Sequence, residues 1–134
     1  MRHIAFLFRR DLRLQDNVGL LAAATAGPVA TYFVLDPAQA PGHRYFSRYG
    51  FGFMVQSLRQ LADQLRAAGG ALHVVACRPD TLPARLAAAG ITELHWNADY
   101  TPFSMQRDER LSAACRAAGI TARVHHDVLL YAPG

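Results

Sequence analysis

The residues with the clearest chemical potential lie in the segment FRRDLRLQDN, Phe8 to Asn17, directly after the apolar run IAFLF. Four charged side chains crowd into its first half: Arg9, Arg10, Asp11 and Arg13. Guanidinium groups bind carboxylates and phosphates through paired N–H donors. The cluster therefore predicts either a site for an anionic ligand or an ion-pair network that braces the segment itself.

Five apolar runs predict the strands that position this segment. They are nearly continuous in hydrophobicity rather than alternating, as expected for a parallel sheet covered on both faces. The predicted strands are Ile4–Phe8, Val29–Leu35, Ala71–Ala76, Thr92–Asn97 and Thr121–His125.

Amphipathic or helix-favouring segments lie between these runs, and each ends at a glycine. In the longest of them, Met54, Leu58, Leu61 and Leu65 recur at helical spacing. Asp16 is the expected N-cap of the first helix. The predicted helices are Asn17–Ala26, Arg44–Ala68, Thr81–Ala89 and Phe103–Ala118.

The alternation of strands and helices predicts one α/β domain over residues 1–134, a Rossmann-like, doubly wound, five-stranded parallel sheet with helices on both faces. Right-handed crossovers favour the strand order 3-2-1-4-5. The winding then reverses between the first and fourth strands, where open α/β sheets bind ligands beyond the carboxyl ends of their strands. Two turns should flank such a site: Arg9–Asp16 and Asn97–Pro102.

The composition indicates an ordinary folded domain, with 51% hydrophobic and 18% charged residues. No apolar run approaches the ~20 residues of a membrane span and no signal pattern opens the chain, so we expect a cytoplasmic protein with no membrane contact. Cys77 and Cys115 are expected to be reduced core thiols. The formal charge of +4 permits an anionic ligand or a surface that faces nucleic acid.

Several chemistries lack their motifs. The chain has no G-x-G-x-x-G, no phosphate-binding P-loop and no G-x-S-x-G. His125, His126 and Asp127 are adjacent rather than at ligand spacing, so no metal site is expected. Three further histidines in or beside predicted strands are expected to be core or edge residues rather than catalysts: His3, His73 and His95.

The segment FRRDLRLQDN resembles the signature that opens the DNA photolyase/cryptochrome family, roughly F-R-x-D-L-R-x-x-D-N. Further stretches fall in the family's order and spacing, and the resemblance covers the whole chain. The N-x-D-Y-x-P motif and the R-D pair that follows it are especially specific. These stretches are VLDP, FMVQSLRQLADQLRAAGGAL, WNADYTPFSMQRDE and DVLLYAPG.

The resemblance implies light harvesting. In this family the N-terminal α/β domain holds an antenna chromophore, which is a methenyl-folate, an 8-hydroxy-deazaflavin, FMN or FAD, and which passes its excitation to a catalytic flavin. Asp99 is the best candidate to hydrogen-bond a ring edge of that chromophore. The cofactor-binding residues implied by position are Arg10, Asp11, Arg13, Leu35, Asp36, Arg48, Asn97, Asp99 and Tyr100.

Two departures from the family pattern bear on chromophore binding. Phe103 and Ser104 stand where folate-binding members carry an Asn-Glu pair, which disfavours folate. Gly50 stands where many members carry an antenna-binding Arg, so either Arg48, two residues earlier, makes this contact after a local shift or the contact is lost. Because the family's helical domain also contributes contacts, we expect weak binding by this chain alone and an empty pocket.

The resemblance also implies what this sequence does not contain. The catalytic FAD, the electron-transfer tryptophans and the damaged-DNA pocket belong to the helical domain of the family, and Trp96 lies in a predicted strand. We therefore assign no catalytic residue and expect no photolyase activity, a light-dependent carbon–carbon lyase reaction, from this chain alone. The expected partner is the helical domain, in cis or in trans, with DNA contacted only through it.

Two other functions stay open. The fold could serve as a non-chromophoric interaction or dimerisation module, and an exposed apolar segment at Leu129, Leu130 and Tyr131 would then favour a homodimer. A nucleotide-binding, stress-type domain would need a glycine-rich phosphate loop, which the sequence lacks.

Overall fold

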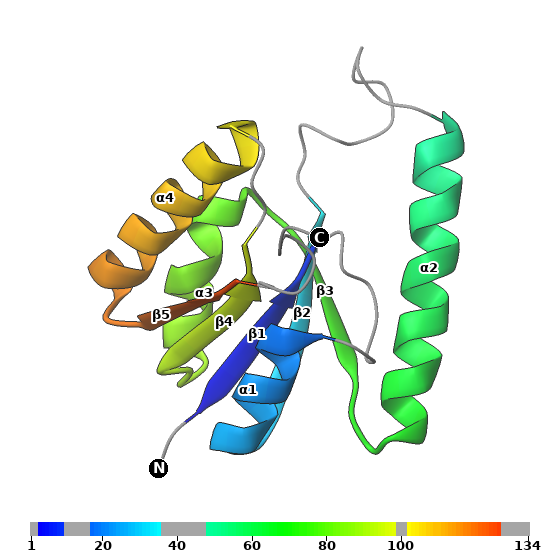
Figure 1. Ribbon diagram of the computed structural model, residues 1–134, viewed down its shortest axis with the longest axis horizontal. Coiled ribbons are helices and arrows are strands. Elements are labelled where there is room, and N and C mark those ends of the chain that lie inside the picture. Colours follow the sequence, from blue (N-terminus) through cyan, green and yellow to red (C-terminus); the bar gives the residue numbers. More distant parts are fainter. Residues whose placement is uncertain (1–2, 10–16, 36–47, 99–101, 127–134) are drawn as a thin grey trace, which may run out of the picture.

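Five parallel strands form a single sheet in the computed structural model, which describes residues 3–9, 17–35, 48–98 and 102–126 (Figure 1). Their order, β3-β2-β1-β4-β5, confirms the predicted doubly wound α/β fold. Three strands have the predicted bounds and two begin one residue later than predicted. The strands are β1 (Ile4–Phe8), β2 (Val29–Leu35), β3 (Leu72–Ala76), β4 (Glu93–Asn97) and β5 (Thr121–His125).

In the part of the chain that the structure describes, four α-helices and one short 3₁₀ helix connect the strands. The predicted helix Thr81–Ala89 is divided, because the Thr81 N–H bonds to the Arg78 carbonyl at 2.9 Å and closes a 3₁₀ turn first. Pro83 has no N–H to donate and therefore suits the first turn of the helix that follows. The helices are α1 (Val18–Ala26), α2 (Arg48–Ala67), η2 (Pro79–Thr81), α3 (Leu82–Ala88) and α4 (Pro102–Ala118).

The N-cap of α1 corrects the sequence-based prediction. Asn17, not Asp16, caps the helix: its backbone is extended, and its Oδ1 accepts a hydrogen bond from the Leu20 N–H at 3.0 Å. Asp16 itself lies outside the described residues. The helix consequently begins at Val18 rather than at Asn17.

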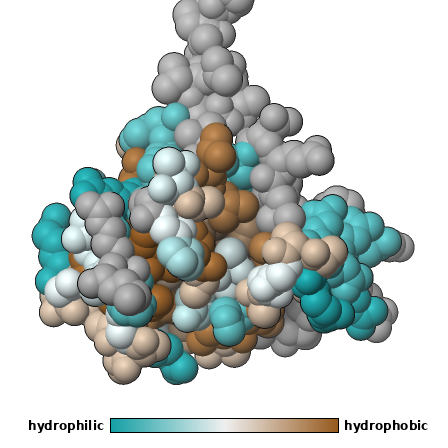
Figure 2. Space-filling model, turned by 90° about the horizontal axis from the view of Figure 1, so that it is seen from below, coloured by the Kyte–Doolittle hydropathy of each residue, from teal (hydrophilic) through white to brown (hydrophobic). Residues whose placement is uncertain are grey.

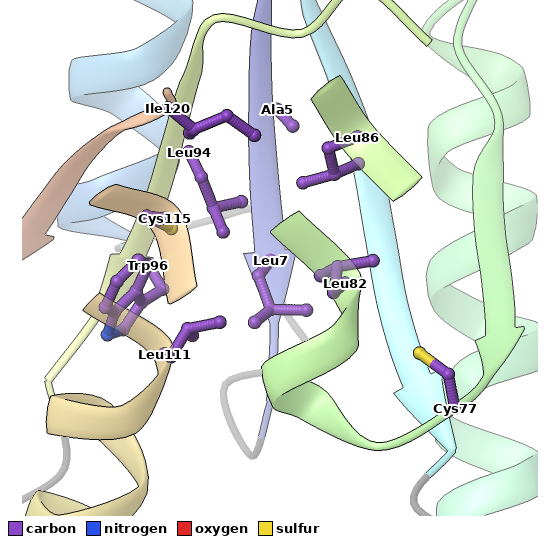
Figure 3. Packing of buried hydrophobic residues seen from close by; sticks show 10 residues of the cluster. All are labelled: Ala5, Leu7, Cys77, Leu82, Leu86, Leu94, Trp96, Leu111, Cys115 and Ile120. Carbon is purple, nitrogen blue, oxygen red and sulfur yellow. The ribbon is translucent and has the colours of Figure 1, made fainter. Parts of the chain in front are cut away.

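The hydrophobic core has two layers, one on each face of the sheet. Successive residues of β1 alternate between them, since side chains along a strand point to opposite faces. Ala5 and Leu7 join the layer under α3 and α4, which extends from Trp96 to Cys77 in Figure 3. Phe6 and Phe8 join the layer under α2, with Phe33, Leu58, Leu61 and Leu65.

The longest helix, α2, packs as its spacing predicted. Leu58, Leu61 and Leu65 are buried, while the side chain of Met54 lies outside the described set. The helix ends at Ala67. Gly69 follows with a φ of 90°, which only glycine readily adopts, and the Gly70 N–H bonds to the Leu65 carbonyl at 2.8 Å. Glycines therefore follow the end of the helix, as expected.

A few large apolar residues are exposed on the described surface. Leu21 on α1, Val74 on β3 and Met105 on α4 are the large exposed hydrophobics. Seen from below, hydrophobic residues gather in the middle of the molecule between hydrophilic flanks (Figure 2). In the described ranges no helix has the length and apolar character to cross a bilayer. The homodimer prediction rests on Leu129–Tyr131, outside these ranges, and stays a prediction.

Candidate functional site

Two of the nine predicted cofactor-binding residues have described side chains. Leu35 ends β2 and is half-buried, and Asn97 ends β4. Arg48 is the first residue of α2, but its side chain is outside the described set. The remaining six lie outside the described residues: Arg10, Asp11, Arg13, Asp36, Asp99 and Tyr100.

Asn97 connects the end of β4 to the start of α1. Its side-chain Nδ2 donates to the Asn17 Oδ1 at 2.7 Å, and its Oδ1 accepts from the Gly19 N–H at 2.8 Å. The first N–H groups of a helix have no partner within the helix and need one from outside. Asn17 and Asn97 supply such acceptors together, which fixes α1 against the carboxyl end of β4.

Gly19 allows this close approach. A Cβ added there would lie 2.5 Å from the Asn97 Oδ1 and 2.8 Å from a ring carbon of Phe6. Both separations are shorter than real Cβ contacts, so a side chain at this position would push α1 away from the sheet. The glycine at the first turn of α1 is therefore required by packing rather than by a positive φ.

Arg9 connects the end of β1 to α4. Its Nη2 donates to the Asn97 carbonyl at 3.0 Å and to the Asp108 Oδ2 at 3.2 Å, while its Nη1 pairs with the Asp108 Oδ1. The Arg9 and Asp108 side chains are only 18% and 14% exposed. A bidentate guanidinium–carboxylate pair at this depth is stronger and more directional than a surface ion pair.

These contacts define one structural unit, which we name the β1–β4 fork: Arg9, Asn17, Gly19, Asn97 and Asp108. It joins the carboxyl ends of the two strands between which the winding of the sheet reverses. The contacts among its groups hold the two strand ends, α1 and α4 in fixed positions relative to one another. The turns that leave β1 and β4 consequently start from fixed positions.

Four of the five members of the fork were not among the predicted cofactor-binding residues: Arg9, Asn17, Gly19 and Asp108. An arginine after a strand and an R-D pair in a later helix are visible, but their sequence separation of 99 residues conceals the contact. The predicted ion-pair network among Arg10, Asp11 and Arg13 concerns residues outside the described set.

Other chemically notable residues behave as core or edge residues. His95 is buried in β4, and His73 stacks on Tyr32 with ring centroids 5.0 Å apart. Cys77 and Cys115 are free and buried, as predicted, and burial raises the pKa of the Cys115 thiol to about 11. Within the described ranges no three His, Cys, Asp or Glu side chains group as metal ligands would.

Comparison with known proteins identifies the same family throughout. The family model for DNA photolyase matches residues 4–134. Cryptochrome-1 of Arabidopsis thaliana is 36% identical over 94% of this chain and 19% of its own length. Deoxyribodipyrimidine photo-lyase of Synechococcus sp. is 35% identical over 97% of this chain and 27% of its own length. The chain thus spans from about a fifth to about a quarter of the length of these relatives.

Solved structures agree with the sequence comparisons. An archaeal photolyase from Sulfolobus tokodaii, determined with two FAD molecules, superposes with a TM-score of 0.86 and 37% identity over 96% of this chain and 30% of its own. A class III photolyase from Agrobacterium tumefaciens superposes with a TM-score of 0.79 and 30% identity over 93% of this chain and 26% of its own. Both contain this α/β fold within a longer chain.

Proposed function

Because this chain belongs to the DNA photolyase family, we propose that it is the antenna-chromophore-binding domain of a photolyase- or cryptochrome-like flavoprotein. It holds a light-absorbing chromophore and passes the excitation to a catalytic flavin bound elsewhere. No bond is made or broken in this domain, so its residues bind and orient rather than react.

The position of the β1–β4 fork carries this proposal. Ligands of open α/β sheets bind beyond the carboxyl ends of the strands where the winding reverses, and the fork joins those strand ends. Arg9 and Asn97 are held there by partners on α1 and α4. A ligand bound there would meet strand ends that are already fixed, and this preorganisation favours binding.

We propose a flavin or a deazaflavin as the chromophore, in preference to methenyl-folate. The Sulfolobus tokodaii photolyase binds two FAD molecules, which implicate a novel light-harvesting cofactor in that protein. Leu35, half-buried at the end of β2, offers the apolar contact that a flat ring system needs. The folate-type Asn-Glu pair is replaced by Phe103 and Ser104.

The proposed binding residues come from four segments. Arg10, Asp11 and Arg13 follow β1, and Asp36 follows Leu35 of β2. Arg48 begins α2. Asp99 and Tyr100 follow Asn97 of β4, and Asp99 is proposed to hydrogen-bond the ring edge. Asn97 acts by fixing where that last turn begins, since its amide bonds to Asn17 and Gly19.

The proposed partner is a helical domain that holds the catalytic FAD and contacts DNA, in the same chain or in another. The curated relatives are several times longer than this chain, which supports a second domain with a separate role. On this proposal the chain alone does not repair DNA, and it binds its chromophore weakly because part of the pocket belongs to the partner.

Fluorescence titration tests the proposal. The chain is titrated with FMN, FAD, an 8-hydroxy-deazaflavin and a methenyl-folate, and the Kd of each is measured. We expect a flavin or the deazaflavin to bind, and Arg10→Ala and Asp99→Ala to raise its Kd about tenfold or more, as loss of one charged hydrogen bond does.

Two surface variants are the matched controls. Arg66→Ala and Asp63→Ala remove the same side-chain types from the far end of α2, where both are more than 70% exposed. They should leave the Kd unchanged. Equal binding by all variants would remove the named residues from the site, and the absence of binding by every chromophore would favour the non-chromophoric interaction module.

A further inference from the structure

Two histidines on neighbouring strands share a hydrogen bond at the edge of the sheet. The Nδ1 of His95 in β4 lies 2.8 Å from the Nε2 of His125 in β5. The two rings are nearly parallel, at 10°, with centroids 5.0 Å apart. His95 is only 5% exposed, and His125 is half-buried. This pair is therefore a cross-strand contact between a core position and the edge strand.

Counting hydrogens shows that the contact suits two neutral rings. Two neutral imidazoles carry two N–H hydrogens, and one of these lies in the shared bond. The second hydrogen lies on one of the two outer nitrogens, so a third hydrogen leaves both outer nitrogens protonated, and one of them is the His95 Nε2. That atom is buried and has no hydrogen-bond partner among the described residues. Protonation of either ring therefore places an N–H donor where nothing described accepts it.

The surrounding charges do not compensate. Glu93 and Arg123 lie near the pair and form their own ion pair, with the Arg123 Nε 3.6 Å from the Glu93 Oε1. His126 follows in the chain, and α1, which contacts β4 and β5, has no charged residue. Burial first, and then the neighbouring cationic groups, lower the pKa of both His95 and His125, and Glu93 opposes this only for His95.

We propose that the His95–His125 pair is a pH-sensitive latch, which holds β5 against β4 while both imidazoles are neutral. The latch adjoins the β1–β4 fork, because Asn97 is the register partner of His125 and the Ala98 N–H bonds to the His125 carbonyl at 2.8 Å. Loosening β5 at acidic pH therefore loosens the end of β4. The proposal does not depend on a bound chromophore.

The sign of the pH effect follows from the lowered pKa values. With β5 open or the chain unfolded, both histidines titrate near the ordinary value of 6.5, whereas the closed pair stays neutral to lower pH. The open state then binds more protons than the closed state. Stability from the latch is fully present above 6.5 and decreases as pH falls below it, toward the lowered pKa of the closed pair.

Amide hydrogen exchange tests the latch. Exchange of the β5 and β3 amides is followed between about pH 5 and pH 7.5 and corrected for the intrinsic pH dependence. Below pH 6.5 the opening constant of β5 should rise by up to about tenfold per pH unit for each histidine that gains a proton, while β3 changes less. His95→Phe and His125→Phe should each flatten the β5 profile.

His73→Phe is the matched control, because His73 lies on the other edge strand and also contacts an aromatic ring, that of Tyr32. It should leave the pH dependence of β5 unchanged. A wild-type β5 profile that is flat, or parallel to that of β3, would overturn the latch.

A readout on the wild-type chain keeps the test independent of how the variants fold. NMR titration of the two imidazoles should give folded-state pKa values below 6.5 for both rings. Values at or above 6.5 would contradict the proposal whatever the variants do.

Discussion

The two faces of β4 differ sharply in their chemistry. Leu94 and Trp96 point into the hydrophobic layer under α3 and α4, and both are fully buried (Figure 3). The alternate residues Glu93, His95 and Asn97 share the opposite face, and each has a specific polar partner. One strand thus contributes bulk burial on one side and directed hydrogen bonds on the other.

This difference shows that one face of β4 mainly stabilises the fold, whereas the other mainly fixes the positions of neighbouring elements. On the apolar face a side chain stabilises the fold through the surface that it buries and the volume that it fills. On the polar face each group is buried at a cost that only its own partner offsets. Substitutions on the first face should therefore change stability most, and those on the second should change geometry as well.

The largest effect is expected on the apolar face. Trp96→Ala leaves a cavity among Leu111, Cys115 and their neighbours, and we expect it to lower the free energy of unfolding by about 3–5 kcal/mol in urea titrations. Leu21→Ala, at a side chain that is 70% exposed, is the control and should cost about 0.5 kcal/mol or less. A loss below 1 kcal/mol for Trp96→Ala would mean that this layer is loosely packed.

A smaller loss, with a change in geometry, is expected at Gly19. Gly19→Ala places a methyl group against Asn97 and Phe6 and should cost about 1–3 kcal/mol through overpacking. Gly70→Ala is the matched control, since its Cβ would meet only ordinary contact at 3.5 Å. Adding Asn97→Ala to Gly19→Ala should recover part of the loss in a double-mutant cycle. Strict additivity would argue against the Asn97 contact.

The ion pair of the fork should contribute less than either packing site. Asp108→Asn keeps the size of the side chain but removes its charge, and we expect a loss of about 1–2 kcal/mol, because the part-buried Arg9 keeps weaker partners. Asp63→Asn breaks the exposed pair with Arg66 and should change stability by about 0.5 kcal/mol or less. Equal effects in the two variants would show that the fork pair behaves as a surface pair.

Much of the fold was predictable because it depends on local patterns. Nearly continuous apolar runs, separated by helical segments that end at glycines, identified all five strands, and the rules for crossovers then gave their order. The N-cap of α1 was missed because Asp16 and Asn17 are both good capping residues. The choice depends on Asn97, which lies 80 residues away in the chain and bonds to Asn17.

The sequence predicted where the candidate site lies but not which residues contact one another there. The end of β4 was expected to bear a functional Asn97, and the structure puts that residue at the fork. The Arg9–Asp108 pair and the His95–His125 pair depend on which elements become neighbours and in what register, and no local pattern encodes that. His95 in particular was expected to be an ordinary core residue, because its partner lies on a different strand.

Mapping chromophore binding by NMR tests the proposed function most directly. Backbone amide shifts are recorded as FMN, FAD or an 8-hydroxy-deazaflavin is added to the chain. We expect the shifted amides to cluster at Arg9, Leu35 and Asn97, the carboxyl ends of β1, β2 and β4, and to spare the amino ends at Ile4 and Glu93. Shifts confined to the amino ends, or none with any of the three compounds, would contradict it.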